Sequence, residues 1–197
     1  MKKKNLKEVF VYLDSINEFI KFNILKIINV NIIYDNYDFS KKIFLDIKNF
    51  CKKHNLNLFI KDNYKAAIKF KLAGLIISHT NKKILGYGNP LCNKQKIKII
   101  GKVHNQKEFF LKKQQKCEKI IFSPIFLTKK YSSNQILNIN KFNLISKYWN
   151  VKKIALGGIN LENISQLRML NISGFAIKSF ALDPNIKNSF KLIHYLK

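Results

Sequence analysis

The sequence is poor in arginine, in cysteine and in long uninterrupted apolar runs. Arg168 is the single arginine among 37 basic residues, although the formal net charge is +26. A protein that reads nucleic acid is expected to carry several arginines, because the guanidinium group makes forked contacts with phosphates and bases. The lysines are instead scattered through every segment beside 24 asparagines, which is typical of compositional drift on solvated faces. We therefore expect no nucleic-acid partner beyond nonspecific attraction at low salt.

The scarcity of cysteine and of apolar runs excludes further classes. Cys51, Cys92 and Cys117 are odd in number and widely spaced, so they predict neither a disulfide framework nor a zinc site. Lys or Asn interrupts every apolar run well short of the ~18 residues of a membrane span. The basic start, residues 1–5, leads into no small-residue cleavage site, so we expect a cytoplasmic protein without membrane contacts. The length, 197 residues, and the absence of a linker rich in Gly, Ser or Pro predict one domain over residues 1–197.

Short β-rich runs alternate with helical patterns along the chain. The predicted strands are 9–13, 30–34, 58–60, 74–77, 98–101, 119–122, 154–156 and 174–177. The predicted helices are 17–23, 39–54, 64–71, 105–117, 141–149, 162–170 and 186–196, with long loops at 78–97 and 123–139. Eight strand–helix units with buried strands of four or five residues favour a single (β/α)8 TIM barrel, with a doubly wound open sheet as the alternative. Such a barrel concentrates its chemistry on the loops that follow the strands.

Two adjacent glycines, Gly157 and Gly158, lie between the seventh predicted strand and a predicted helix. They leave no Cβ between backbone and ligand, and the unpaired N–H groups of a helix start favour a phosphate. An ordinary tight turn is the alternative. Ile177, Lys178 and Ser179 end the eighth strand, and the commonest phosphate site of these barrels follows strands seven and eight. We therefore predict a phosphate seat at this place.

Four segments resemble, in order and spacing, the signature loops of thiamine-phosphate synthase and its relative thiazole tautomerase: 101–105, 123–130, 155–159 and 174–179. The resemblance implies a barrel enzyme that joins hydroxymethylpyrimidine diphosphate to thiazole phosphate and releases diphosphate. Its partners would be small phosphorylated substrates, and Mg²⁺ would help the diphosphate to leave. Gly158 and the amides around Lys178 and Ser179 would hold the thiazole phosphate.

The same resemblance assigns residues to the diphosphate. Thr128 and Lys129 or Lys130 would contact it from the loop after the sixth strand, and Asp62 would be a magnesium ligand. Lysine and Mg²⁺ neutralise the charge that develops on a departing diphosphate, and hydroxyl groups orient it. His104 is a candidate acid or base, while a histidine that caps the following helix is the alternative.

Three departures from the family pattern concern the diphosphate half. After the second strand the family offers glutamine, arginine and lysine, where this chain has Ile32, Tyr34 and Asn36. After the fourth strand the family offers a second acidic metal ligand, but residues 78–81 contain no carboxylate. The serine expected after the fifth strand is also missing. A single carboxylate makes a weak Mg²⁺ site, because this ion usually takes one or two carboxylates together with substrate phosphates.

The roles of two aspartates and one histidine are left open. Asp14 and Asp35 end the first two strands and could supply a lost carboxylate, although a capping or loop role is favoured. His79 follows the fourth strand and would face the barrel mouth. The alternatives to the synthase are a tautomerase-like or thiazole-phosphate-binding relative without transferase activity, and a basic non-enzymatic binding protein on a barrel scaffold.

Overall fold

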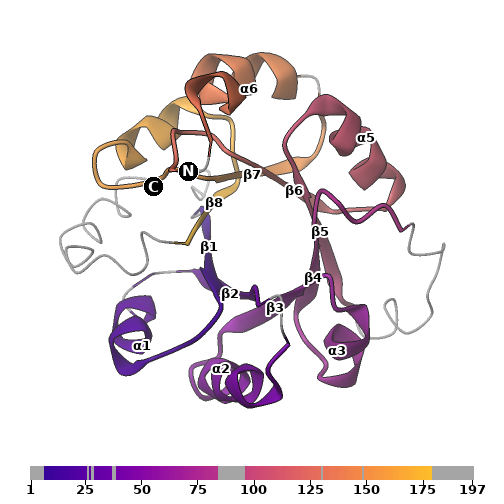
Figure 1. Cartoon of the computed structure of the whole chain (residues 1–197), viewed down its shortest axis with the longest axis vertical. Coiled ribbons are helices and arrows are strands. Elements are labelled where there is room, and N and C mark those ends of the chain that lie inside the picture. Colours follow the sequence, from indigo (N-terminus) through magenta and orange to yellow (C-terminus); the bar gives the residue numbers. More distant parts are fainter. Residues whose placement is uncertain are drawn as a thin grey trace, which may run out of the picture.

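The structure, a computed structural model, describes residues 7–25, 27, 29–36, 39–83, 96–129, 131–147 and 149–178. Eight parallel strands close into a barrel in the order of the sequence, and β8 pairs with β1 (Figure 1). The strands are β1 (Glu8–Leu13), β2 (Val30–Tyr34), β3 (Asn57–Lys61), β4 (Gly74–Ile77), β5 (Lys98–Val103), β6 (Lys119–Phe122), β7 (Lys152–Leu156) and β8 (Gly174–Ile177). The TIM barrel predicted from the sequence is confirmed, and the open-sheet alternative is wrong.

The helices lie outside the ring of strands (Figure 1). They are α1 (Glu18–Ile24), α2 (Lys41–Lys53), α3 (Tyr64–Lys69), α5 (Gln106–Gln114) and α6 (Asn138–Ser146), with 3₁₀ turns η1 (Ser133–Gln135) and η2 (Ile164–Met169). Several helices begin at a side-chain N-cap. The side-chain oxygens of Ser40, Asn63 and Asn105, each one residue before a helix, accept from backbone N–H groups of its first turn. The predicted helix 186–196 and residues 84–95 of the predicted loop lie outside the described residues. In the described part, no helix has the length and apolarity to cross a membrane.

Strand alternation sorts the buried side chains into two layers. Phe10 and Tyr12 of β1 point into the barrel, whereas Val9, Val11 and Leu13 face the helices. The other strands fill the interior in the same way, with Ile33, Phe59, Ile76, Ile100, Ile121, Ile154, Leu156 and Ala176. The barrel is therefore a packed core, and a ligand has room at its ends rather than inside it.

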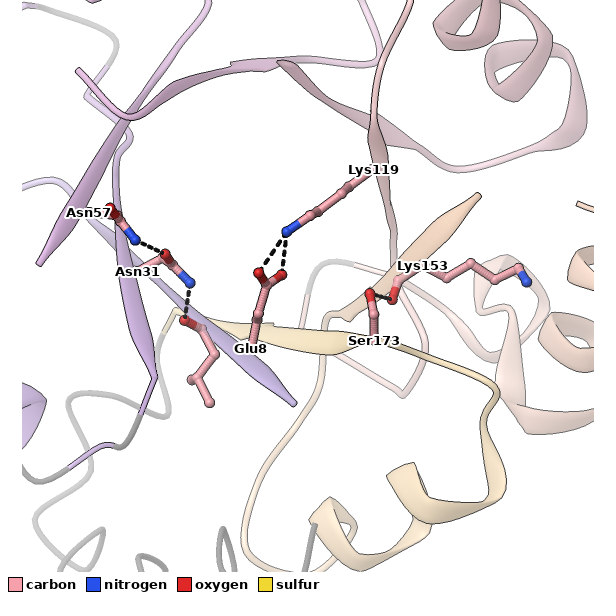
Figure 2. Close-up of polar contacts among 7 residues, drawn as sticks. Glu8, Asn31, Asn57, Lys119, Lys153 and Ser173 are labelled. Atoms are coloured by element: carbon pink, nitrogen blue, oxygen red, sulfur yellow. Dashed lines mark hydrogen bonds and ion pairs between the residues drawn. The ribbon is translucent and has the colours of Figure 1, made fainter. Parts of the chain in front are cut away.

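Polar side chains cover the amino-terminal end of this core (Figure 2). The Lys119 ammonium donates to both carboxylate oxygens of Glu8, at 2.7 and 2.5 Å. Beside this ion pair, the Asn57 amide donates to the Asn31 side-chain oxygen at 3.0 Å, and the Asn31 amide donates to the Val9 carbonyl at 3.4 Å. These contacts satisfy polar groups where the interior meets solvent, so this end is occupied by the protein's own side chains.

Two helical predictions need correction. The helix predicted at 141–149 runs from Asn138 to Ser146 instead, because the Leu137 and Asn138 amides bond to carbonyls of the loop after β6 and start the helix early. Trp149 leaves the helix to stack on Phe109, with ring centroids 3.8 Å apart. The α-helix predicted at 162–170 is the six-residue 3₁₀ segment η2.

Candidate functional site

The glycine pair lies after β7, where two loops meet. Gly157 and Gly158 have φ values of 99° and 69°, the left-handed region that a Cβ disfavours. A Cβ on Gly158 would lie 2.3 Å from the Leu127 carbonyl oxygen, and one on Gly157 would lie 2.8 Å from the Pro124 Cα. The two glycines thus let the loop after β6 approach the loop after β7, and the Phe126 N–H donates to the Gly157 carbonyl at 3.1 Å.

The turn after the glycines uses most of its own amides, contrary to the expected open helix start. The Asn160 side-chain oxygen accepts from the Glu162 and Asn163 N–H groups, at 3.0 and 3.1 Å. In return the Asn163 side chain accepts from the Asn160 N–H and donates to the Gly158 carbonyl. Asparagine side chains that bond to nearby backbone compete with helix formation, which explains why η2 is short. A ligand phosphate near Gly158 would therefore depend on single backbone amides after β7 and after β8 rather than on a helix dipole.

The loop after β6 carries the residues assigned to the diphosphate. Thr128 is part-buried, and its hydroxyl accepts from the Tyr131 N–H at 3.2 Å. Lys129 is exposed beside it. Lys130 and Ser179, the other residues assigned to substrates, lie outside the described residues. Ile177 faces the outer layer with its side chain, so any contact with a ligand would come from its backbone.

His104 is held at the end of β5 from several sides. Its Nδ1 lies 2.5 Å from the Ser123 carbonyl oxygen, so Nδ1 is assigned the proton and Nε2 is the unprotonated nitrogen. Nε2 is buried without a hydrogen-bond partner among the described residues. The His79 ring stands edge-on at 4.4 Å. Burial lowers the pKa of His104, opposed by the Ser123 carbonyl and reinforced by the Lys102 charge.

The capping role considered for His104 belongs to its neighbour. The Asn105 side chain accepts from the Glu108 N–H at 2.9 Å and so begins α5. The Glu108 carboxylate in turn accepts from the His104 N–H at 2.7 Å. The imidazole is therefore not the cap of α5, and its lowered pKa keeps it neutral near physiological pH.

Asp62 does not have the surroundings of a magnesium ligand. Its Oδ1 accepts from the Ser78 N–H at 3.0 Å and from the Asn81 amide at 2.9 Å. An amide thus stands in the segment where the family offers a second carboxylate. The Asn81 carbonyl accepts in turn from Lys112 of α5 and from Gln115, the C-cap of that helix, at 2.9 and 3.0 Å.

Within the residues that the structure describes, no three His, Cys, Asp or Glu side chains come together as a metal-binding group. Magnesium prefers several oxygen ligands and usually one or two carboxylates together with substrate phosphates. The donors around Asp62 include amide N–H groups that compete for its oxygen. The residues present therefore do not fit the Mg²⁺ site that the resemblance implies.

A charged group at the ends of β2, β3 and β8 joins Asp35, which the sequence left open as a candidate carboxylate, to two lysines. Asp35 accepts from the Lys61 ammonium at 2.6 Å, and its second oxygen lies 3.5 Å from the Lys178 ammonium. The side chain of Asp35 is only 12% exposed, so the two lysines hold it as a part-buried carboxylate. A cavity of about 250 Å³ opens here, with Asp35, Lys61 and Asp62 in its wall.

Strand alternation is the signal that could have favoured a mouth position for Asp35 over a capping or loop role. Ile32 and Tyr34, compared above with the glutamine and arginine of the family, face the helices. Ile33 faces the interior, so the next inward position after β2 is Asp35, and its carboxylate reaches Lys61 and Lys178. The residues compared with the family pattern therefore lie on the face of β2 that points away from the barrel interior. Loss of the expected cations stands, but a carboxylate rather than an asparagine occupies the mouth position.

Comparisons with known proteins find similar thiamine-phosphate synthases. A thiamine-phosphate synthase of Prochlorococcus marinus is 28% identical over 152 residues, 74% of this chain and 39% of the relative. One of Flavobacterium psychrophilum is 27% identical over 157 residues, 76% of this chain and 74% of the relative. The chain thus spans about two fifths of the length of the first relative and of similar Prochlorococcus proteins.

A solved structure shares the fold. Thiamine phosphate pyrophosphorylase from Pyrococcus furiosus superimposes with a TM-score of 0.76 at 13% identity, covering 98% of this chain and 96% of that one. A family model described as thiamine monophosphate synthase matches residues 34–180, a span that runs from the end of β2 past the end of β8. The chain belongs to the thiamine monophosphate synthase family.

Proposed function

We propose that this chain joins hydroxymethylpyrimidine diphosphate to thiazole phosphate and releases diphosphate. The bond between the pyrimidine methylene carbon and a diphosphate oxygen breaks, and diphosphate leaves with the electron pair. The thiazole ring nitrogen then bonds to that carbon. Catalysis of such a step requires alignment of two substrates and stabilisation of charge on the leaving group. The observation that carries the proposal is the family match over residues 34–180, which includes every loop from β2 to β8.

The chain's own residues can be given roles under this proposal. Backbone amides after β7 and β8, beside Gly158 and Lys178, would bind the thiazole phosphate. The Thr128 hydroxyl would orient the diphosphate, and the exposed Lys129 ammonium would neutralise part of its charge. The neighbouring loops, joined by the bond from Phe126 to Gly157, support this assignment because they bring both phosphate-binding segments to one edge.

The test is a direct assay of turnover. Purified protein is incubated with both substrates, with Mg²⁺ or with EDTA, and thiamine phosphate and diphosphate are measured. We expect both products in equal amounts. Lys129→Ala should lower the rate, and Lys42→Ala, an exposed lysine on α2, is the matched control. Absence of both products under both conditions would refute the transferase role.

A second candidate function is tautomerisation of a thiazole phosphate, and His104 favours it. Its Nε2 is buried, lacks a partner within the described part of the chain and belongs to an imidazole whose pKa burial lowers. Such a nitrogen can take a proton from a bound ring and return it to another atom. This reaction needs the thiazole phosphate but no diphosphate and no metal.

The two functions give different results in the same protein. Tautomerase activity is followed by NMR as conversion of one thiazole phosphate tautomer into the other. We expect His104→Asn to abolish a tautomerase, because the asparagine cannot carry the proton. Conversion without formation of thiamine phosphate would establish the second function and exclude the first.

A further inference from the structure

Three lysines extend the inner face of the barrel at its carboxyl-terminal mouth. Lys61 follows Phe59 by two residues and Lys178 follows Ala176 by two, and both Phe59 and Ala176 fill the interior. Lys102 stands two residues after the interior Ile100. A Cβ on the intervening Gly101 would contact Lys112 of α5, so Gly101 faces the helices and Lys102 faces inward.

Charge interactions join two of these lysines at one carboxylate. Asp35 binds Lys61 and lies 3.5 Å from the Lys178 ammonium, which joins the ends of β3 and β8 across β1 and β2. Burial lowers the pKa of His79, and the charges of Lys102, Lys112 and Lys61 lower it further. The Lys178 side chain is 52% exposed, so it can turn toward a ligand at little cost.

Tyr12 adds a buried hydroxyl on which the charges of Asp35 and Asp62 act. The residue is 4% exposed, belongs to the interior layer and has no hydrogen-bond partner for its hydroxyl within the described residues. Burial raises the pKa of Tyr12, and the charges of Asp35 and Asp62 raise it further, so the hydroxyl stays protonated. Buried polar groups are nearly always paired, which indicates that this donor receives its acceptor from a ligand.

The carboxylates of the mouth are already engaged by nitrogen donors. Asp35 is held by two ammonium groups, and Asp62 accepts from the Ser78 and Asn81 N–H groups. A divalent cation that bound Asp35 or the Oδ1 of Asp62 would have to displace these contacts. Ammonium groups already supply positive charge where the family relies on Mg²⁺.

We propose that Lys61, Lys102, Lys178 and the Tyr12 hydroxyl bind the diphosphate group in the mouth without a divalent cation. The identity of the anion rests on the proposed function. Asp35 positions Lys61 and Lys178, and lysine serves here as a point charge that does not demand forked geometry. Release of diphosphate would then be assisted by the chain itself rather than by magnesium.

The test measures binding of inorganic diphosphate by calorimetry at physiological salt, with EDTA or with Mg²⁺. We expect an EDTA-state Kd within roughly threefold of the Mg²⁺ value, because close charge–charge contacts in the mouth survive screening. Lys61→Ala, Lys102→Ala and Lys178→Ala should each weaken binding about tenfold. Lys42→Ala on α2 controls for the general positive charge and should leave the Kd unchanged.

Tyr12→Phe separates binding from folding. The change removes a buried hydroxyl that has no partner among the described residues, so the melting temperature should stay the same or rise while diphosphate affinity falls several-fold. An unchanged Kd for Tyr12→Phe, or binding that appears only with Mg²⁺, would overturn the proposal.

The binding and turnover measurements together distinguish the metal-free diphosphate site from transferase activity. Metal-free diphosphate binding without turnover would remove the synthase and leave the anion site. Turnover that strictly requires Mg²⁺, with no binding in EDTA, would keep the synthase and remove the metal-free site.

Discussion

Replacement of Gly158 by alanine tests whether the glycine pair exists to join two loops. Alanine at a φ of 69° costs about 1–2 kcal/mol. Its Cβ would lie 2.3 Å from the Leu127 carbonyl oxygen, so the loop after β6 must move. The bonds from Ile125 to Leu156 and from Phe126 to Gly157 would then weaken, at about 1 kcal/mol each.

An opposing effect acts on the unfolded chain. Alanine restricts the unfolded backbone and stabilises the protein by about 0.4–1 kcal/mol. We therefore expect Gly158→Ala to lower the free energy of unfolding by about 2–3 kcal/mol. For a chain of this length that corresponds to a fall in Tm of about 5–10 °C.

The assay is urea unfolding followed by circular dichroism, with hydrogen exchange at the Phe126 amide as a local readout. Gln166→Ala on η2 is the control, because this exposed side chain should change stability by less than about 0.5 kcal/mol. A Gly158→Ala protein as stable as this control, with the Phe126 amide still protected, would show that the close approach of the loops does not require glycine.

Three further predictions concern charge. Burial lowers the pKa of His104 below its ordinary 6.5, so between the lowered pKa and 6.5 the unfolded chain binds more protons than the folded one. Tm should therefore fall as pH drops through this window, and His104→Asn should reduce the slope of Tm against pH. Glu8→Gln leaves the Lys119 ammonium, 10% exposed, without its counter-charge and should cost about 1–3 kcal/mol in urea unfolding, whereas adding Lys119→Met should recover most of the loss. Asn81→Asp places a second carboxylate beside Asp62, so Mg²⁺ at about five times its Kd should stabilise this variant by roughly 1 kcal/mol, measured as a rise in Tm. An equal Tm shift in the parent protein would show that the existing donors already bind the ion.

The division of the mouth into two halves matters for the chemistry. Gly157 and Gly158 join the loops assigned to the thiazole phosphate and to Thr128. The ends of β2, β3 and β8 hold Asp35 between Lys61 and Lys178. The half that departs from the family pattern is thus rebuilt with charged side chains rather than left empty, which supports retention of an anionic ligand.

Strand positions could be read from the sequence because each strand is a short apolar run between polar turns. β2, β4, β6 and β8 begin and end at the predicted residues, and the other strands agree within two. Burial on both faces of a closed parallel sheet requires such runs, so the pattern is local and strong. Helix bounds were less accurate: η2 depends on Asn160 and Asn163, whose side chains bond to the backbone across the turn.

Three features follow from local sequence alone: the alternation of eight strands with helices, the place of Gly157 and Gly158 after β7, and the lack of a carboxylate in residues 78–81 after β4. Which residues beyond the strand ends face the mouth depends on the folded barrel. A one-residue difference moves a side chain from the helix layer to the barrel interior, and this parity separates Asp35 from Asn36. Closure of the barrel then brings Lys61 and Lys178, 117 positions apart, to one carboxylate. Such contacts follow from the register of distant strands, which no local pattern encodes.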